Sequence, residues 1–392
     1  MDPNSFRDSP SGRMLRAGAG YWAFVPSPLP PHLDWSPALV TALSRADRAL
    51  GELAGIGRTV GNPHLLIVPF MRKEAVLSSA IEGTQASISD LYAFEAEQLS
   101  FLERPADVKE VFNYVRAMER GLERLKTLPV SLRLVRELHS DLMQGVRGEL
   151  GTPGDFRRTQ NWIGPPGCTL EDATYVPPPP GEVAEAMGAL ENFIHTEEQA
   201  PPLVRLAMMH YQFEAIHPFI DGNGRVGRLL IALLLCEWGL LPQPLLYLSA
   251  YFEANRALYY DLLLAVSQRG EWKEWLVFFL EAIAAQSRDA WLRVDRLQEL
   301  HHEYRSRYQT GGPARMLQVV DHLFARPVLS VSQLSDHLGV QFPVASRYIK
   351  RLEQDEVIAE ITGKGRNRLY LARGIMEAIE APIAAEVRST ET

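Results

Sequence analysis

Cysteine is nearly absent from this chain, and long apolar runs are missing. The 392 residues contain two cysteines, Cys168 and Cys236, too few and too far apart for a disulfide framework or a zinc-ligand set. This usage is typical of a reducing compartment. No stretch reaches the roughly 20 consecutive apolar residues of a membrane helix, and the N-terminus lacks the apolar core of a secretory signal. We expect a cytoplasmic protein with no membrane contact.

An excess of positive charge is also missing. The chain has 40 Lys and Arg against 48 Asp and Glu, a net charge of −8, which argues against a protein that coats nucleic acid or anionic membrane. One region differs. Between residues 313 and 373 nine Lys and Arg stand against six Asp and Glu, which leaves room for a local basic patch.

The sequence predicts a mainly α chain with one long irregular insertion. The first forty residues are rich in Pro, Ser and Gly and predict an extended arm, laid across the body by Tyr21, Trp22 and Phe24. Apolar residues then recur at helical spacing, including a helix over about 65–83. Residues 151–180 are rich in Gly and Pro, and a loop this long is more often functional than accidental. Its "TYV" is a candidate strand.

The C-terminal region has the outline of a winged helix. After "QTGGP" at 309–313, a typical linker, three short helical patterns precede a hairpin pattern with a Gly-Lys-Gly tip. The motif "SRYIKR", from Ser346 to Arg351, would form a recognition helix, and "GKGRNR" a basic wing. Residues 330–373 therefore predict a DNA-binding module, with protein docking or dimerisation as the alternative.

The stretch "HPFIDGNGRVGR", from His217 to Arg228, contains GNGRVG, which fits the dinucleotide pattern G-x-G-x-x-G. That turn must follow a buried parallel strand. The preceding apolar residues recur three and four apart, which is a helix pattern; they include Leu206, Met209, Phe213 and Ile216. The context excludes a dinucleotide turn and predicts a loop between two helices.

The residues around these glycines fit phosphate chemistry. Free N–H groups at a helix start, with the positive end of the helix dipole, attract a phosphate. Arg225 and Arg228 are three apart and can reach the same polyphosphate. Asp221 is a candidate Mg²⁺ ligand, because that ion prefers hard oxygen donors. His217 can take a proton from an attacking hydroxyl. Together they predict a phosphoryl- or nucleotidyl-transfer site.

This stretch resembles the signature of the Fic family, H-P-F-x-[DE]-G-N-G-R-x-x-R, without departure. The resemblance implies a Fic-type helical bundle with a small β-hairpin flap, and transfer of AMP from ATP to Ser, Thr or Tyr hydroxyls of target proteins. It assigns His217 as the base and Asp221 as the Mg²⁺ ligand. It implies the following ATP contacts: Gly222, Asn223, Gly224, Arg225, Val226, Gly227, Arg228, Tyr175, Val176, Tyr259 and Tyr260. For the two last tyrosines, core filling is the alternative.

A second motif resembles the family's inhibitory pattern [ST]-x-x-x-E-[GN]. "SSAIEG" supplies Ser78, Glu82 and Gly83. The resemblance implies that Glu82 pairs with Arg228 where that arginine should hold the γ-phosphate, so that the α-phosphate is not aligned for attack. Such a chain would be autoinhibited by its own helix.

The expected organisation has three parts. They are an N-terminal arm and helical region (1–110), a Fic catalytic domain (111–308) and a winged-helix domain with its tail (313–392). The family implies target docking at the flap, 163–178, and we expect a homodimer. Two alternatives stay open: a Fic enzyme that transfers another phosphate-containing group or removes AMP, and a nucleotide-sensing, DNA-binding regulator.

Overall fold

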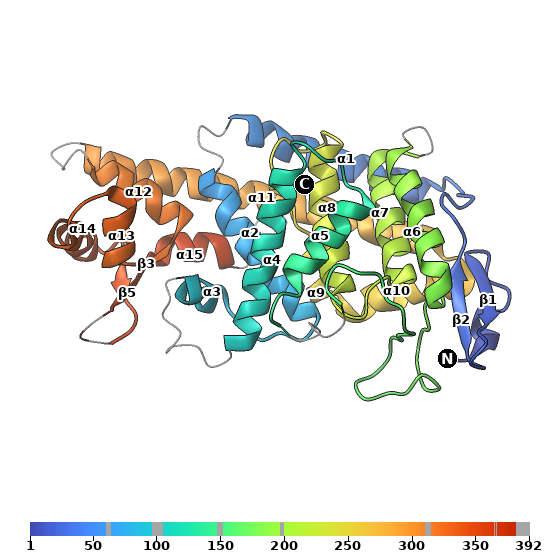
Figure 1. The fold of residues 1–392 in the computed structure, drawn as a ribbon. Coiled ribbons are helices and arrows are strands. Elements are labelled where there is room, and N and C mark those ends of the chain that lie inside the picture. Colours follow the sequence, from blue (N-terminus) through green and yellow to red (C-terminus); the bar gives the residue numbers. More distant parts are fainter. Residues whose placement is uncertain are drawn as a thin grey trace.

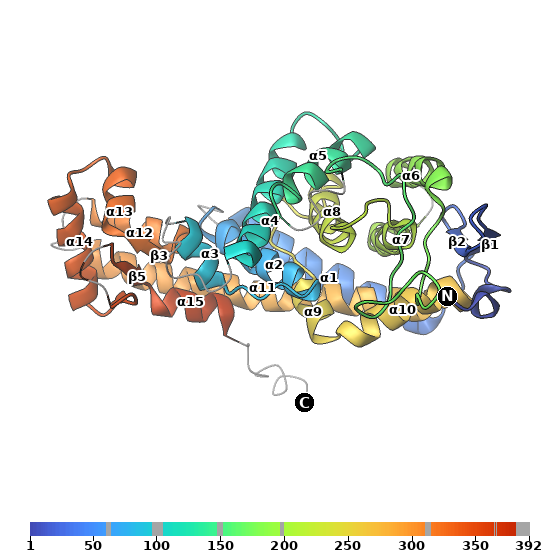
Figure 2. The same cartoon turned by 60° about the horizontal axis from the view of Figure 1, so that its bottom comes forward.

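The molecule is built along one long helix. The computed structural model describes residues 1–59, 64–95, 105–146, 152–196, 200–309, 315–363, 365 and 367–381. Helix α11 (Trp272–Gln309) runs for 38 residues through most of the molecule, with α1 (Pro37–Thr59) packed alongside it (Figure 1 and Figure 2). The fold is mainly helical with small antiparallel sheets, as the sequence predicts. Among the described residues, no helix combines the length and apolar character that crossing a membrane requires.

A helical bundle on α11 carries the signature. Its members are α4 (Pro105–Arg124), α5 (Leu132–Leu142), α6 (Pro180–His195), α7 (Pro202–Ile216), α8 (Asn223–Glu237), α9 (Ser249–Ala254) and α10 (Arg256–Arg269). Helix α7 contacts α1, α6, α8, α10 and α11, and α8 contacts α4, α5 and α7. Because both are enclosed, they bury residues on nearly all faces rather than on one stripe. The loop between them is therefore held from both ends.

The N-terminal segment is not the extended arm that its composition predicts. After a short 3₁₀ helix (Pro3–Phe6), β1 (Gly12–Arg16) and β2 (Trp22–Pro26) form an antiparallel hairpin. Phe24 is buried, with its ring centroid 6.0 Å from that of Tyr175, whereas Trp22 is 39% exposed. Trp22 lies beside the hairpin turn, whereas Ala23 to Pro26 are all buried. Of the three aromatic residues, Phe24 is the buried anchor.

The C-terminal region has winged-helix topology. Helices α12 (Met316–Ala325), α13 (Val331–Leu338) and α14 (Phe342–Gln354) are followed by β4 (Ala359–Glu360) and β5 (Leu369–Leu371), and β3 (Val328–Ser330) completes a sheet of order β3-β5-β4. Gln309, the first residue of the predicted linker, is the last residue of α11. Residues 310–314 lie outside the described residues, as do Lys364, Arg366 and 382–392.

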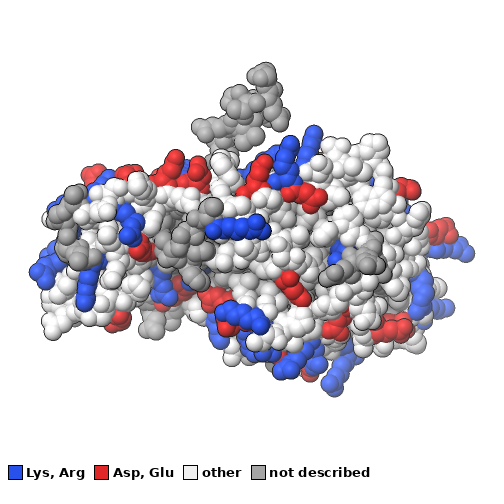
Figure 3. Space-filling view, turned by 90° about the horizontal axis from the view of Figure 1, so that it is seen from above, with Lys and Arg blue, Asp and Glu red and all other residues white. Residues whose placement is uncertain are grey.

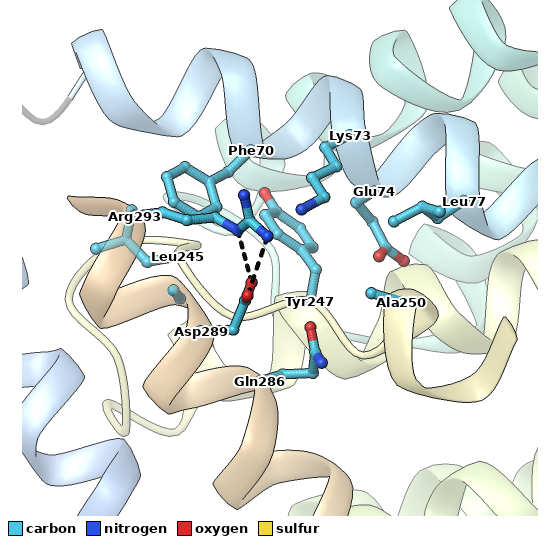
Figure 4. A pocket seen from close by; sticks show the side chains of 11 residues that line it. Phe70, Lys73, Glu74, Leu77, Leu245, Tyr247, Ala250, Gln286, Asp289 and Arg293 are labelled. Carbon is cyan, nitrogen blue, oxygen red and sulfur yellow. Dashed lines mark hydrogen bonds and ion pairs between the residues drawn. The ribbon is translucent and has the colours of Figure 1, made fainter. Parts of the chain in front are cut away.

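One C-terminal helix was missed, and it contacts the predicted inhibitory helix. Helix α15 (Arg373–Glu380) packs on α11 and on α2 (His64–Ile81), which is followed by α3 (Ile88–Glu95). Lys73 of α2 donates a hydrogen bond to the carbonyl of Ile379, and Arg293 of α11 donates to the same carbonyl at 2.6 Å. Asp289 pairs with Arg293 beside a small cavity of about 20 Å³ (Figure 4). Two cations thus bind the carbonyl end of α15, where the helix dipole favours them.

Candidate functional site

The loop between α7 and α8 is fixed by its own side chains. Asn223 accepts a hydrogen bond from the backbone N–H of Phe219 and donates one to its carbonyl, each at 2.9 Å. Phe219 is fully buried, and its ring stacks on His139 at 3.7 Å. The side chain of Asn223 therefore shapes the loop, and the predicted phosphate contact at this position is left to its backbone N–H.

Two glycines make room where α8 begins. Gly222 is the N-cap, with φ of 79°, a left-handed conformation that favours glycine. A Cβ on Gly224 would collide with the carboxylate of Glu82 and lie 2.8 Å from the guanidinium of Arg228. Gly227 instead lets α8 approach Phe213 of α7 closely. An acidic side chain thus lies against the helix N-terminus, the place where the sequence predicts a phosphate.

His217 ends α7 in an unusual backbone conformation. Its φ of 49° and ψ of 61° are left-handed, although it is not a glycine. The imidazole Nδ1 lies 3.3 Å from the carbonyl of Glu214. A carbonyl can only accept, so Nδ1 carries the proton in this contact and Nε2 keeps a lone pair. Burial, assisted by the positive charge of Arg157, lowers the pKa of His217 to about 4. At neutral pH the imidazole is an uncharged base.

Arg228 is held entirely by the end of α2. Its Nη2 donates to Oε1 of Glu82 at 2.7 Å and to the carbonyl of Ser78 at 2.9 Å, and its Nε donates to the Ser78 hydroxyl at 2.8 Å. The arginine side chain is 2% exposed. Burial alone would raise the pKa of Glu82, but Arg228 outweighs it and holds that pKa below its usual value. The ion pair that the sequence predicts is present. Gly83, after the helix, has φ of 92° and turns the chain.

Arg225 has different partners from Arg228. Its guanidinium is 3.1 Å from Glu110 of α4, and both side chains are 3% exposed. A second nitrogen lies 3.6 Å from the carboxylate of Asp221. The two arginines, predicted to reach one polyphosphate together, are thus bound to different carboxylates. Arg225 links the core of the bundle to Asp221 at the rim.

Comparison with known proteins identifies this arrangement. Residues 40–123 match the model of the Fic/DOC family N-terminal region, and residues 129–235 match the Fic/DOC family model. The helical bundle that carries the signature loop is therefore a Fic domain. The second match ends inside α8 and includes the whole loop from His217 to Arg228.

Named relatives share only part of their length with this chain. Protein adenylyltransferase Fic of Drosophila grimshawi is 37% identical over 120 residues, which is 30% of this chain and 23% of the relative. The corresponding protein of Drosophila virilis is 35% identical over 120 residues, 30% of this chain and 22% of that relative. The chain therefore spans less than a quarter of the length of these relatives.

Solved structures share the fold. A Fic family protein from Desulfovibrio desulfuricans G20 has a TM-score of 0.55 at 20% identity, over 88% of this chain and 98% of the other. Fic-1 from C. elegans, residues 134–508, has a TM-score of 0.50 at 21% identity, over 67% of this chain and 75% of the other. At these identities the likeness concerns the Fic fold alone.

The structure buries the side chains of several predicted nucleotide contacts. Tyr175 is buried and donates to the carbonyl of Ala215, and Val176 is buried against Ala23. Their side chains thus anchor the flap to the N-terminal hairpin. Tyr259 is also buried, with its hydroxyl 2.8 Å from Nε2 of His210. This burial fits the alternative that Tyr259 fills the core. All three side chains are buried, and contact with a nucleotide at these positions stays a prediction.

Val226 and Tyr260 differ in exposure. Val226 is fully buried, so only its backbone can face a ligand. Tyr260 is 39% exposed, and its pKa is raised to about 12 by burial and by the negative charge of Glu82. Tyr260 stays a candidate for contact with a nucleotide base.

Asp221 is the one predicted metal ligand. Its side chain is 48% exposed, and one carboxylate oxygen accepts from the backbone N–H of Gly222 at 2.6 Å. No group of three or more His, Cys, Asp or Glu suited to a metal is present among the described residues. Mg²⁺ is commonly held by one or two carboxylates together with substrate phosphates. A single exposed carboxylate beside a phosphate cradle fits that pattern.

Three residues around the loop were missed. His139 donates from Nε2 to the carbonyl of Asp221 at 3.1 Å, and burial lowers the pKa of His139 to about 4. Glu110 neutralises Arg225, and Arg157 donates to the carbonyl of His217. No motif marks these positions. Arg157 alone lies in a segment, 151–180, that its length and composition had already marked as functional.

The winged helix presents a mixed surface. Arg347 and Lys350 of α14 are exposed, whereas Arg351 pairs with Asp355 at 2.8 Å. Lys and Arg side chains lie at this end of the molecule, and both signs are interspersed over the described part of the face in Figure 3. The exposed Phe342 begins α14 at the edge of a groove of about 1100 Å³. DNA binding through residues 330–373 stays a prediction.

Proposed function

We propose that this Fic protein is a protein adenylyltransferase that is inhibited by its own helix α2. One observation carries the proposal. The uncharged base His217 lies on the loop that leads into the N-terminus of α8. The carboxylate of Glu82 lies against that N-terminus, where a phosphate would bind, and pairs with Arg228 of the same helix. The name of the Drosophila relatives, protein adenylyltransferase, supports the chemistry.

The transfer step follows from these positions. The oxygen of a target hydroxyl bonds to the α-phosphorus of ATP, and the bond between that phosphorus and the α,β-bridging oxygen breaks. Pyrophosphate leaves with the electron pair, and Nε2 of His217 takes the hydroxyl proton. Backbone N–H groups of the first turn of α8 and the guanidinium of Arg228 stabilise the phosphate charge. Mg²⁺, held by Asp221, would neutralise part of the polyphosphate charge.

Inhibition is a competition between two anions for one site. The carboxylate of Glu82 takes Arg228 and lies against Gly224, so a triphosphate in the productive position must displace it. ATP that binds beside Glu82 has its α-phosphate out of line with the base. Misalignment alone can cost about 10²-fold in rate.

The target would dock on the flap in extended form. Ile163 and Tyr175 pair through their backbones, and Phe24 of β2 donates to the carbonyl of Val176. The far side of the 174–176 segment is thus covered by the N-terminal hairpin. Within the described part of the chain, the backbone N–H groups of Trp162 and Gly164 have no backbone partner. We propose that a target strand adds along the 162–164 edge.

Transfer of radiolabel from α-³²P-ATP tests the proposal. The variants are Glu82→Gly, Glu82→Gly with His217→Ala, and Glu82→Gly with His32→Ala, in which an exposed histidine serves as the matched control. With Mg²⁺, we expect more label on protein with Glu82→Gly than with wild type. The label disappears with His217→Ala and persists with His32→Ala.

The same assay separates the alternatives. Label that is lost from pre-modified protein only when Glu82 is present would indicate AMP removal. Competition by a different nucleotide would indicate transfer of another group. Absence of label from the protein and from a cell lysate, despite measurable ATP binding, would exclude the adenylyltransferase and favour the nucleotide-sensing regulator. That regulator must still bind DNA in a sequence-specific way when His217 is replaced by Ala.

A further inference from the structure

Arg157 is a buried cation that is satisfied by carbonyl groups alone. It is 2% exposed, and no carboxylate within the described ranges forms an ion pair with it. Nε donates to the carbonyl of His217 at 2.8 Å and Nη2 to that of Pro178 at 2.5 Å. Longer bonds reach the carbonyls of Ile216 and Thr159. Burial lowers the pKa of Arg157 to about 10, so the guanidinium stays charged at neutral pH.

These bonds join two parts of the site that are distant in sequence. Pro178 ends the flap, and His217 carries the base. The left-handed backbone of His217 is strained and persists only where its surroundings enforce it. Arg157 binds the carbonyl of that residue directly. Its neighbours act in parallel, because Gln160 donates to the carbonyl of Pro177 and Asn161 to that of Phe219.

We propose that Arg157 is a positioning residue that fixes the flap relative to the imidazole of His217 and so aligns the target hydroxyl with its base. The inference rests on the proposed function, because alignment matters only if the flap holds the target strand. Arg157 touches no reacting atom in this account. It acts through the backbone of both partners.

The planar guanidinium is essential to this role. Its nitrogens donate in fixed, diverging directions, so one side chain can hold two carbonyls at a set separation, whereas a lysine ammonium is a point donor on a flexible stem. Charge adds a second effect. The charged groups that influence His217 are Arg157, which opposes its protonation, and Glu82, directly after α2, which favours it. Glu214 of α7 meets His217 through its carbonyl, and burial raises the pKa of its own carboxyl to about 8.

Two substitutions separate geometry from charge. In the Glu82→Gly background, Arg157→Lys keeps the positive charge but loses the diverging N–H donors of the guanidinium, and Arg157→Met loses both. Arg158→Met is the matched control, because Arg158 is the exposed neighbour. The readouts are the rate of self-labelling at saturating α-³²P-ATP and the Kd of Mg-ATP from calorimetry. We expect Arg157→Lys to lower the rate about 10- to 100-fold, with the Kd within about twofold because Arg157 lies outside the phosphate cradle.

A second readout does not depend on activity. Titration of His217 by NMR with ¹⁵N-labelled histidine should give a raised pKa in Arg157→Met and an almost unchanged one in Arg157→Lys. A purely structural role would lower the melting temperature without moving either the titration or the rate per folded molecule. If Arg157→Met fails to fold, Arg157→Lys decides.

The proposal is overturned if folded Arg157→Lys labels itself within about twofold of its parent, or if folded Arg157→Met leaves the titration of His217 in place. If the Glu82→Gly parent shows no labelling at all, the proposed function fails. The NMR titration then still tests whether Arg157 acts on His217.

Discussion

Glu82 Oε1 and Arg228 Nη2 lie 2.7 Å apart, although the two residues are separated by 146 positions in the chain. The same guanidinium donates to the hydroxyl and the carbonyl of Ser78. One side chain of α8 therefore binds the last turn of α2 through three contacts. The arginine cannot meet a γ-phosphate in its best geometry until these contacts loosen.

Ser78→Ala should weaken the inhibition in part. It removes the acceptor for Nε of Arg228, a buried bond to a charged group, and we expect a loss of about 1.5–3 kcal/mol in unfolding free energy. Self-labelling should rise severalfold above wild type but stay below Glu82→Gly, because the ion pair remains. Ser79→Ala is the matched control, since the Ser79 hydroxyl is buried and forms no hydrogen bond with the residues that the structure describes. Equal labelling by both serine variants would contradict this account.

Glu110→Gln should destabilise the bundle strongly. Arg225 and Glu110 are both 3% exposed, and removing one charge of a buried pair leaves the other uncompensated, at a cost of about 3–5 kcal/mol. Urea unfolding measures the difference. Glu123→Gln, on the same helix but 71% exposed, should change stability by less than about 1 kcal/mol. A loss of similar size in the two variants would show that the buried pair contributes nothing special.

Glu74→Gln should change how stability depends on pH. Glu74 of α2 accepts from the hydroxyl and N–H of Ser249 and from the hydroxyl of Tyr114. Burial raises its pKa from 4.5 to about 7. The folded state therefore binds more protons than the unfolded state between these values, so this group lowers stability as pH rises from 4.5 to 7.

Glutamine removes that titration. The unfolding free energy of Glu74→Gln minus that of wild type should increase from pH 5 to pH 7.5, by at most about 3 kcal/mol, because only wild type loses stability over this range. Urea titrations of both proteins at the two pH values give this difference. Parallel pH dependence in the two proteins would show that Glu74 is already ionised in the folded state.

The signature loop was predictable because its chemistry lies in twelve consecutive residues. Local sequence dictates the glycine conformations, the helix start at Asn223 and the adjacency of Asp221 to the cradle. The pair between Glu82 and Arg228 was predicted from the family resemblance, and no local pattern indicates it. The resemblance also named Tyr175 and Tyr259 as nucleotide contacts, but it does not give their tertiary packing, and the fold buries both side chains.

Other features depend on contacts between distant segments. Arg157 and Glu110 carry no motif, and their roles appear only when the flap and α4 are placed against the loop. Helix α15 was missed because a short amphipathic segment after a hairpin gives little signal until Lys73 and Arg293 bind its end. The homodimer and the domain boundaries stay predictions.

The fall of kcat/KM at acid pH should follow the protonation of His217. Its pKa of about 4 means that the base is already neutral at pH 6. In Glu82→Gly, kcat/KM for ATP should be flat between pH 6 and 7.5 and fall only below about pH 5. Glu82 raises the pKa of His217, so its removal moves this fall to lower pH. A fall near pH 6.5, the ordinary histidine value, would contradict this environment for the base.

Asp221→Asn should remove the advantage that Mg²⁺ gives to ATP binding. Asp221 is 48% exposed beside the cradle, and asparagine keeps an oxygen acceptor for the N–H of Gly222 while losing the charge. Calorimetry on the Glu82→Gly parent with and without Asp221→Asn, each in Mg²⁺ and in EDTA, forms a closed cycle. We expect Mg²⁺ to tighten ATP binding about tenfold or more in the parent and less than about twofold in the double variant, because a hard cation binds an amide oxygen more weakly than a carboxylate. The two proteins should bind ATP alike in EDTA. If Mg²⁺ tightens binding equally in both, the metal is held by the phosphates alone and Asp221 serves to orient Arg225.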